Sequence, residues 1–372
     1  MMTINMNAKN NKKARPGVAL LVVLFIVMAI TILSLGFVSR SDVELACGQN
    51  MILRTEMDYL AESGLEHARG LILNPQDVST EFWMGGTDLQ LTSGSNFYDV
   101  RVDRDANDLC NYIIDCNSYR RATDGSDIGR SSLRAELRLD PCIAYWVGSS
   151  TTVSSAMIIN GDVYCGGNLT NNHTINGDVF ANALSGSGTI AGQQKAVGDL
   201  SLAWPRITVE DFTSNYPVQI IDANSLSGEA FGPYDPVRVC YHNGDLELAG
   251  GVQIEDMLIV DANLTISGNG NVITAGKNLP ALLVGGNLII EDGCGLDVYG
   301  LAVVKGQTQI SAGAAGVNII GGLFVENGIV GGGNISITAA PTKTAIVVWS
   351  EVGIAEKWGQ AAGAFYRSIE RR

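Results

Sequence analysis

The longest hydrophobic stretch of the chain lies near its N-terminus. Residues 18–38 carry no charge, and a basic leader with Lys9, Lys12, Lys13 and Arg15 precedes them. At about 1.5 Å per residue, a helix over this stretch is about 32 Å long, enough to cross a bilayer. The basic flank predicts a cytoplasmic leader and an extracytoplasmic remainder. The predicted anchor comprises Val18, Leu21, Val22, Leu24, Ile26, Ile30, Leu33 and Val38.

Three interpretations of this stretch are open. A cleaved secretory signal normally has a shorter apolar region, about 7 to 15 residues, and a small-residue cleavage site after it. A plain signal anchor needs only the apolar run and its basic flank. In the third interpretation the leader ends at Gly17, cleavage falls between Gly17 and Val18, and the apolar helix remains on the mature protein.

Helical spacing continues beyond the apolar run. Apolar residues recur in steps of three, four and seven as far as Leu71, and the next proline is Pro75. This pattern predicts one helix over about residues 18–73, with a length of about 80 Å. Such a length is typical of a membrane span, a coiled coil or a filament spine.

Residues 74–140 alternate between apolar and polar side chains. Strand-like alternation covers residues 97–102, 112–116 and 133–139, and polar turns rich in Asp, Asn and Gly separate these segments. The pattern predicts a small antiparallel meander. Because so small a sheet is not stable alone, we expect it to pack on the distal half of the helix.

Repeats dominate residues 143–340. The segment 258–266 resembles 282–290, and Asn-Gly-Asp-Val recurs at residues 160 and 176. Steps of about 20 to 24 residues predict a right-handed β-solenoid, in preference to a β-sandwich with Gly-rich loops. We expect Val260, Val284 and Val325 to form one stacked interior column and Asn287 to lie at a turn. The last segment, 346–372, has helical spacing and predicts a helix that caps the solenoid or docks a partner.

Charge and cysteine content narrow the function. The chain has 38 acidic and 24 basic residues and a net charge of −14, which disfavours nucleic acid as a partner. A disulfide among Cys110, Cys116 and Cys142 is a candidate beyond the membrane, and buried free thiols are the alternative. The Cys and His spacing does not support a zinc site.

Catalysis finds little support in the sequence. The acidic residues of the repeats are scattered and mostly adjoin Gly or Asn, as turn residues do. The repeats contain no phosphate-binding loop and no nucleophile or metalloprotease motif. We therefore expect no catalytic residue, no metal and no cofactor. A polysaccharide-active enzyme is the least favoured alternative.

Two segments resemble a known family. Residues 15–24, RPGVALLVVL, resemble the start of PilX-like type IV minor pilins and of tip minor pseudopilins of type II secretion. Residues 59–68, YLAESGLEHA, resemble the A-E-x-G-L-E stretch that PilX-like proteins carry at the same distance. The resemblance implies a prepilin leader cut between Gly17 and Val18, with methylation of the new N-terminus. Major pilins have Glu at the fifth mature position, where this chain has Val22, as in tip-located minor members.

The expected fold class is α+β: a pilin-like long transmembrane helix with a small antiparallel sheet, followed by a right-handed β-solenoid. The expected domains are the leader 1–17, a pilin-like part 18–140 with its membrane segment 18–38, a solenoid head 141–345 and a capping helix 346–372. The resemblance implies pilus or secretion-filament assembly, with other pilins or pseudopilins, a prepilin peptidase and the inner membrane as partners. The protein would pass from the inner membrane to a filament or the cell surface. A solitary envelope adhesin or scaffold is the alternative, and no motif identifies a ligand of the head.

Overall fold

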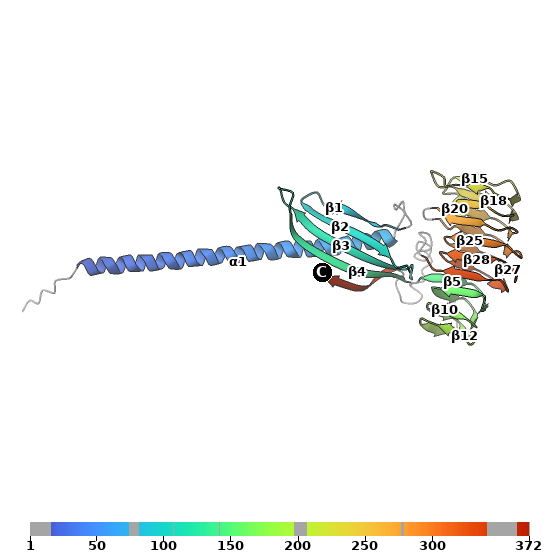
Figure 1. Ribbon diagram of the computed structural model, residues 1–372, viewed down its shortest axis with the longest axis horizontal. Coiled ribbons are helices and arrows are strands. Elements are labelled where there is room, and N and C mark those ends of the chain that lie inside the picture. Colours follow the sequence, from blue (N-terminus) through green and yellow to red (C-terminus); the bar gives the residue numbers. More distant parts are fainter. Residues whose placement is uncertain are drawn as a thin grey trace, which may run out of the picture.

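The structure is a computed structural model that describes residues 16–73, 82–106, 108–140, 142–196, 207–276, 279–340 and 363–371. A long helix leads to a small antiparallel sheet, and a stack of short parallel strands lies beyond the sheet (Figure 1). This arrangement confirms the expected combination of a pilin-like helix and sheet with a β-solenoid. The handedness of the solenoid stays a prediction.

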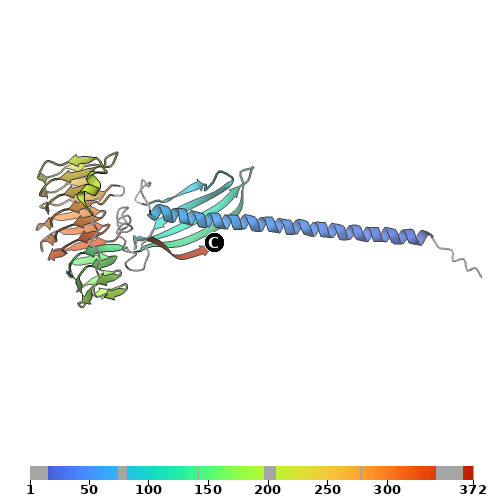
Figure 2. The ribbon, with the colours of Figure 1, turned by 180° about the vertical axis from the view of Figure 1, so that it is seen from behind.

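Helix α1 runs over Pro16–Leu73, 58 residues without a break. Pro16 is tolerated because a proline in the first turn removes no intrahelical hydrogen bond. Only the distal third of α1 is covered by the sheet (Figure 2). Met57, Ala61, Leu65 and Ala68 are buried there, and their spacing of three or four residues places them on one side of the helix.

Five antiparallel strands form the sheet, in the order β1-β2-β3-β4-β32. Their bounds are β1 Gly85–Leu89, β2 Asn96–Arg104, β3 Asn111–Arg121, β4 Asp127–Asp140 and β32 Gly363–Arg371. Alternate residues such as Val100, Ile114 and Leu137 are buried against α1, because successive side chains of a strand point to opposite faces. The predicted meander on the distal half of the helix is confirmed.

The prediction of a capping helix over 346–372 is wrong where the structure tests it. Residues 363–371 form β32, which pairs antiparallel with β4 and places Phe365 opposite Arg138. Residues 341–362 and 372 lie outside the described residues. Helical spacing of Phe365 and Ile369 is a weak signal, and the unpaired backbone edge of β4 supplies hydrogen bonds that override it. The head is thus an insertion between two neighbouring strands of the sheet.

The head is a solenoid with three faces, and all of its strand pairs in the described residues are parallel. Face 1 contains β5 Ile143–Val147, β8 Asp162–Cys165, β11 Val179–Ala181, β14 Gln194–Ala196, β15 Val218–Ile220, β18 Val239–His242, the second half of β20 Gln253–Val260, β23 Leu282–Val284, β26 Ala302–Val304 and β29 Leu323–Val325. Face 2 contains β7 Met157–Asn160, β10 Thr174–Asn176, β13 Thr189–Ile190, β17 Ala230–Phe231, the first half of β20, β22 Asn271–Ala275, β25 Gly295–Tyr299, β28 Gly316–Ile320 and β31 Ile335–Thr338.

Face 3 completes each turn of the solenoid. It contains β6 Thr151–Val153, β9 Asn168–Asn171, β12 Ala183–Ser185, β16 Ser225–Leu226, β19 Leu246–Leu248, β21 Leu264–Ile266, β24 Leu288–Ile290, β27 Thr308–Ile310 and β30 Ile329–Gly331. A short helix, α2 Val209–Thr213, buries Phe212 among the outward apolar side chains of face 1.

The chain enters the solenoid in its middle. Strand β5 pairs with β8 on one side and with β29 on the other. The chain coils from β5 outward to β14, resumes at the opposite end with β15 and returns to β29 (Figure 1). We call the β29–β5 and β31–β7 pairings the seam. The first and last turns of the head are therefore neighbours.

The interior forms columns of stacked side chains. Val260, Val284 and Val325 lie in one column and are fully buried, as predicted, with Val304 between the last two. The column continues across the seam to Val147. Asn287 lies at a turn, also as predicted: its backbone N–H donates to Asn263 Oδ1, and its own Oδ1 accepts the N–H of Gln307, each over 2.8 Å.

One interior column of apolar side chains contains a buried polar residue, Thr308. Thr308 is fully buried between Leu288 and Ile329, and its hydroxyl has no hydrogen-bond partner within the described residues. Burying an unpaired hydroxyl costs about 1 to 3 kcal/mol. We therefore expect Thr308→Val to stabilise the head by about 1 kcal/mol.

Thermal or denaturant unfolding of Thr308→Val, of a control variant and of the parent protein checks this prediction. Thr265→Val is the matched control, because Thr265 occupies the outward, partly exposed middle position of β21 on the same face. Equal midpoints for Thr308→Val and the parent protein would show that the hydroxyl is not a stability defect.

Candidate functional site: the N-terminal helix and its joint to the head

The first half of α1 is apolar and uncovered. Over an 18-residue window its mean hydropathy is 2.9, and none of that window is buried within the protein. By length and composition the helix can cross a membrane. The predicted anchor residues Leu21, Val22, Leu24, Ile26, Ile30, Leu33 and Val38 are all exposed. Val18 lies in the first turn of α1, beside Gly17, and its side chain is outside the described residues.

A polar segment separates the apolar half of α1 from the sheet. Arg40 and Glu44 form an exposed ion pair with 2.9 Å between Nε and Oε1, an i,i+4 contact worth only about 0.3 to 0.5 kcal/mol. Met51 and Ile52 remain exposed, and Met57 is the first buried residue of the helix. Among the described elements, therefore, none covers α1 between Leu20 and Ile52.

The YLAESGLEHA segment lies where the helix approaches the sheet most closely. A Cβ on Gly64 would collide with Cys116 Sγ and the ring of Tyr98, so only glycine fits there. Ala61, Leu65 and Ala68 are buried beside it, whereas Glu62 is exposed. The small residues of the segment thus allow the helix to approach the sheet, and its acidic residues remain at the surface.

Polar contacts fix the helix on the sheet. The hydroxyl of Ser118 donates to the carbonyl of Met57 over 2.6 Å, and that of Ser131 donates to Asp58 Oδ1 over 2.6 Å. Arg120 and Glu56 form an ion pair at the membrane-proximal end of the contact. These bonds define one rotational setting of α1 against β3 and β4, and they leave its apolar half projecting away from the sheet (Figure 2).

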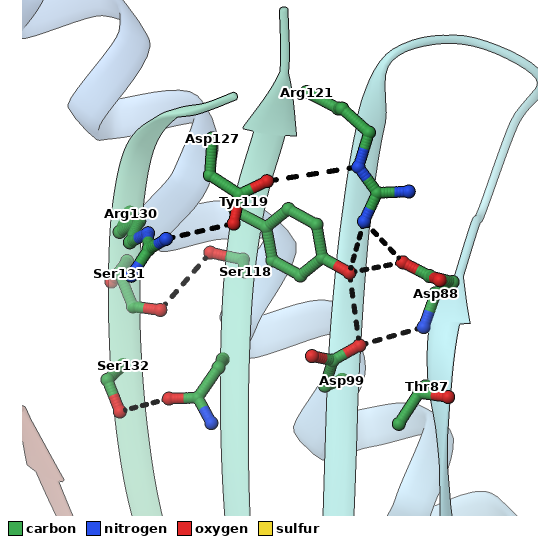
Figure 3. Close-up of a pocket in the computed structure, with 11 residues that line it drawn as sticks. Thr87, Asp88, Asp99, Ser118, Tyr119, Arg121, Asp127, Arg130, Ser131 and Ser132 are labelled. Carbon is green, nitrogen blue, oxygen red and sulfur yellow. Dashed lines mark hydrogen bonds and ion pairs between the residues drawn. The ribbon is translucent and has the colours of Figure 1, made fainter. Parts of the chain in front are cut away.

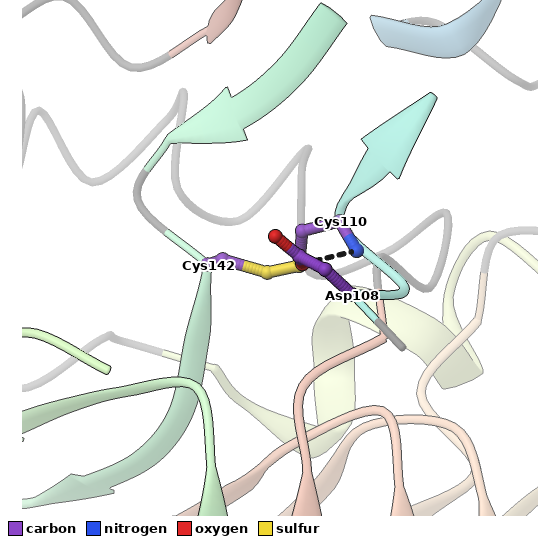
Figure 4. A group of neighbouring side chains, drawn as sticks. All are labelled: Asp108, Cys110 and Cys142. Atoms are coloured by element: carbon purple, nitrogen blue, oxygen red, sulfur yellow. Dashed lines mark hydrogen bonds between the residues drawn. A yellow bond between two sulfur atoms is a disulfide. The ribbon is translucent and has the colours of Figure 1, made fainter. Parts of the chain in front are cut away.

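A disulfide holds the joint between sheet and head. Cys110, in the turn before β3, is bonded to Cys142, the residue before β5, with 6.2 Å between the Cα atoms (Figure 4). Of the three candidate cysteines, Cys116 is left as a buried free thiol, and burial raises its pKa to about 12. Asp108 lies beside the disulfide and accepts the backbone N–H of Cys110 over 3.1 Å.

The first turn of the head is anchored through a buried carboxylate. Asp162 accepts the backbone N–H groups of Cys142 and Asp178, each over 2.9 Å. Burial raises the pKa of Asp162 to about 6, and the two backbone donors oppose that rise. Cys142 is therefore bonded through its sulfur to Cys110 of the sheet and through its backbone N–H to Asp162 of the head. These two bonds fix the point at which the chain enters the head.

A polar pocket of about 600 Å³ opens on the face of the sheet opposite the helix (Figure 3). Its centre is Tyr119, whose hydroxyl donates to Asp88 Oδ1 over 2.5 Å and lies 3.3 Å from Asp99 Oδ1. Arg121 pairs with Asp88 over 2.8 Å, and the two hydrogen bonds from Tyr119 and Arg121 lower the pKa of Asp88. The charged and polar side chains of Tyr119, Asp88, Asp99 and Arg121 are thus one another's hydrogen-bond and ion-pair partners across β1, β2 and β3. We call this cluster the clasp, and its role is to hold the strands together.

Sequence reasoning did not find this clasp or the Cys110–Cys142 pairing. The members of the clasp come from three strands, β1, β2 and β3, and no motif joins them in the sequence. The only nearby feature that the sequence indicated was the polar turn at 123–130, which joins β3 to β4. The assignment of Gly17 and Val18 to peptidase cleavage stays a prediction, because residues 1–15 lie outside the described residues.

Comparisons with known proteins provide little further evidence. No family model matches the chain, and no curated protein matches it. Among solved structures, the competence-associated pilin ComZ from Thermus thermophilus is similar over 86% of this chain and 97% of its own. The two share 10% sequence identity, with a TM-score of 0.28. At this level the likeness does not establish a common family.

Proposed function

We propose that this protein is a membrane-anchored, pilin-like subunit that presents a β-solenoid head. The observation that carries the proposal is the division of α1 into two parts. Residues 57–72 bury one side against the sheet, whereas residues 20–52 are covered by none of the described elements. An uncovered apolar helix needs a bilayer, or the equivalent helices of neighbouring subunits, to bury its surface.

The finer proposal concerns processing and assembly. A prepilin peptidase cuts between Gly17 and Val18, the new N-terminus is methylated, and the helix leaves the inner membrane to join other pilins or pseudopilins. The head then stands at the surface or tip of a pilus-like or type II secretion filament. Val22 supports a tip position, because it provides no carboxylate to pair with the N-terminal amine of a following subunit. The proposal includes no catalytic role.

Analysis of the mature N-terminus tests this proposal. Intact-mass measurement of the protein extracted from membranes should show a chain that begins at Val18. Gly17→Leu should block this cleavage while the protein still fractionates with the membrane, because the apolar helix is unchanged. Gly36→Leu, an exposed position inside the apolar run, is the matched control and should be processed normally.

Two outcomes would contradict the pilin-like role. A chain that retains Met1 would favour a solitary envelope adhesin or scaffold with a permanent anchor. A chain that begins beyond residue 38 would favour a cleaved secretory signal.

A further inference from the structure

Face 2 of the head contains a groove that crosses the seam. Its volume is about 460 Å³, and its walls come from β25, β28, β31 and β7, with the turns that precede β7, β22, β28 and β31. Strand β7 belongs to the first turn of the head, whereas β25, β28 and β31 belong to its last turns. The groove is therefore complete only when the two ends of the insertion meet.

One wall of the groove is a register-matched column of side chains. Asp297 pairs with Asn318, Asn318 with Ser336, and Ser336 with Ile158, each one strand further along the solenoid. With neighbouring strands about 4.8 Å apart, the column spans about 14 Å. Its members are partly or fully exposed, so their side chains face the groove and solvent.

Glycine keeps the floor of the groove open. Gly295 and Gly316 are register partners at the start of β25 and β28. At Gly316, φ is +131° and a Cβ would find no atom closer than the carbonyl of Asn334 at 3.9 Å. A side chain at Gly316 would project into the space of the groove and narrow it. Glycine here therefore keeps the groove open, in addition to allowing the positive φ.

The chemistry of the walls excludes several ligand classes. None of the described lining residues is basic, and Asp297 is the only charged residue among them, so phosphates, nucleic acids and acidic glycans are disfavoured. The strands are paired on both sides, so an extended peptide finds no free edge to join. The polar column does not suit a purely apolar partner.

What remains is a ligand with many neutral hydroxyl groups and some apolar surface. Asp297, Asn318 and Ser336 offer a carboxylate, an amide and a hydroxyl at regular spacing, which suits repeated hydroxyl groups. Ile158, on the groove wall, is 50% exposed. Tyr299 is 43% exposed and lies two residues beyond Asp297 on the same side of β25, next to the column but outside the lining of the groove. An aromatic ring beside hydrogen-bonding groups suits the apolar face of a sugar ring. We propose that the groove binds a neutral oligosaccharide that lies along the solenoid axis.

The test uses the full chain in a detergent that contains no sugar, because a glycosidic detergent would compete for the groove. The probes are the neutral hexasaccharides of cellulose, starch, chitin and mannan, with hexagalacturonate as the acidic comparison, measured by titration calorimetry. At least one neutral hexasaccharide should bind, and its disaccharide should bind more weakly, since the column spans several sugar units.

Variants locate the site. Asn318→Ala and Asp297→Ala should each weaken the binding about tenfold or more, the effect of losing about one hydrogen bond. Gln309→Ala is the matched control: Gln309 occupies the same outward middle position on β27, but on face 3, and its loss should change nothing. Ala315→Trp, at an exposed position on the groove wall, should block binding without touching the column.

The proposal fails if none of the neutral hexasaccharides binds or if only hexagalacturonate does. It also fails if Gln309→Ala weakens binding as much as Asn318→Ala, or if Ala315→Trp binds normally. This inference does not depend on the proposed role of the helix. A chain that retains Met1 can still bind a glycan, and a processed chain can fail to bind one.

Discussion

Val284→Asp is expected to unfold the head. Val284 is fully buried in the middle of a valine column, with Val260 and Val304 directly above and below it. The substitution removes buried apolar surface and places a carboxylate among the buried valine side chains of this column, a combined cost of at least about 4 kcal/mol. The free energy of unfolding of a typical domain is about 5 to 15 kcal/mol, so this substitution removes a large part of it. The measurement is the thermal midpoint of the β-sheet circular dichroism signal.

Asn287→Asp is the matched control for this experiment. It introduces the same carboxylate three residues away on the same turn, but at a position where Oδ1 already accepts the N–H of Gln307. Asp keeps that acceptor, and Asp245 performs the same role for Asn263 earlier in the same ladder of turns. We expect almost no change in the midpoint. Equal melting of the two variants would contradict the solenoid interior described above.

Gly64→Leu is expected to detach the helix from the sheet. The added side chain would collide with Cys116 and Tyr98, both buried in the contact, and overpacking of this kind typically costs about 1 to 3 kcal/mol or more. Hydrogen exchange of β2 and β3 amides should therefore accelerate. The head should melt as before, because its interior does not include Gly64.

Alanine substitutions at Gly64 and at Gly70 provide a second test of the close approach. Alanine favours a helix over glycine by about 1 kcal/mol, so Gly70→Ala, where no atom lies within 4 Å, should stabilise α1. Gly64→Ala should instead destabilise the contact, since even one methyl group meets Cys116. Combining Gly64→Ala with Cys116→Ala should recover part of the loss. If both single glycine variants stabilised the protein alike, the close approach at Gly64 would be disproved.

Repetition made the head predictable. Each turn buries its apolar residues against the next turn, so the sequence repeats itself wherever the environment does, and Val260, Val284 and Val325 could be placed in one column without a structure. The exposed helix and the meander followed from period alone, because a helix and a strand place apolar residues at different intervals. The alternation did not say which side of each strand faces the helix; the structure shows that Val100 and Ile114 are on the buried side.

Long-range pairings were not predictable. Phe365 and Ile369 have helical spacing, and only the open edge of β4, more than 200 residues earlier, makes their segment a strand. The seam joins Trp146 to Phe324, and no local signal marks either as a partner of the other. For the same reason Cys110 could not be assigned to Cys142 rather than Cys116, because connectivity depends on the fold and not on spacing.

The middle entry of the chain into the head has a consequence for biosynthesis. A chain that emerges N-terminus first builds β5 early, yet Tyr145 must wait for Leu323, 178 residues later, to cover its second edge. Strand β4 waits still longer for β32. Pairings of such high sequence separation form slowly, and uncovered edges promote aggregation until they close. A chain truncated before β29 therefore leaves the edges of both β4 and β5 unpaired, so the full length of the insertion is needed to close the sheet and the solenoid.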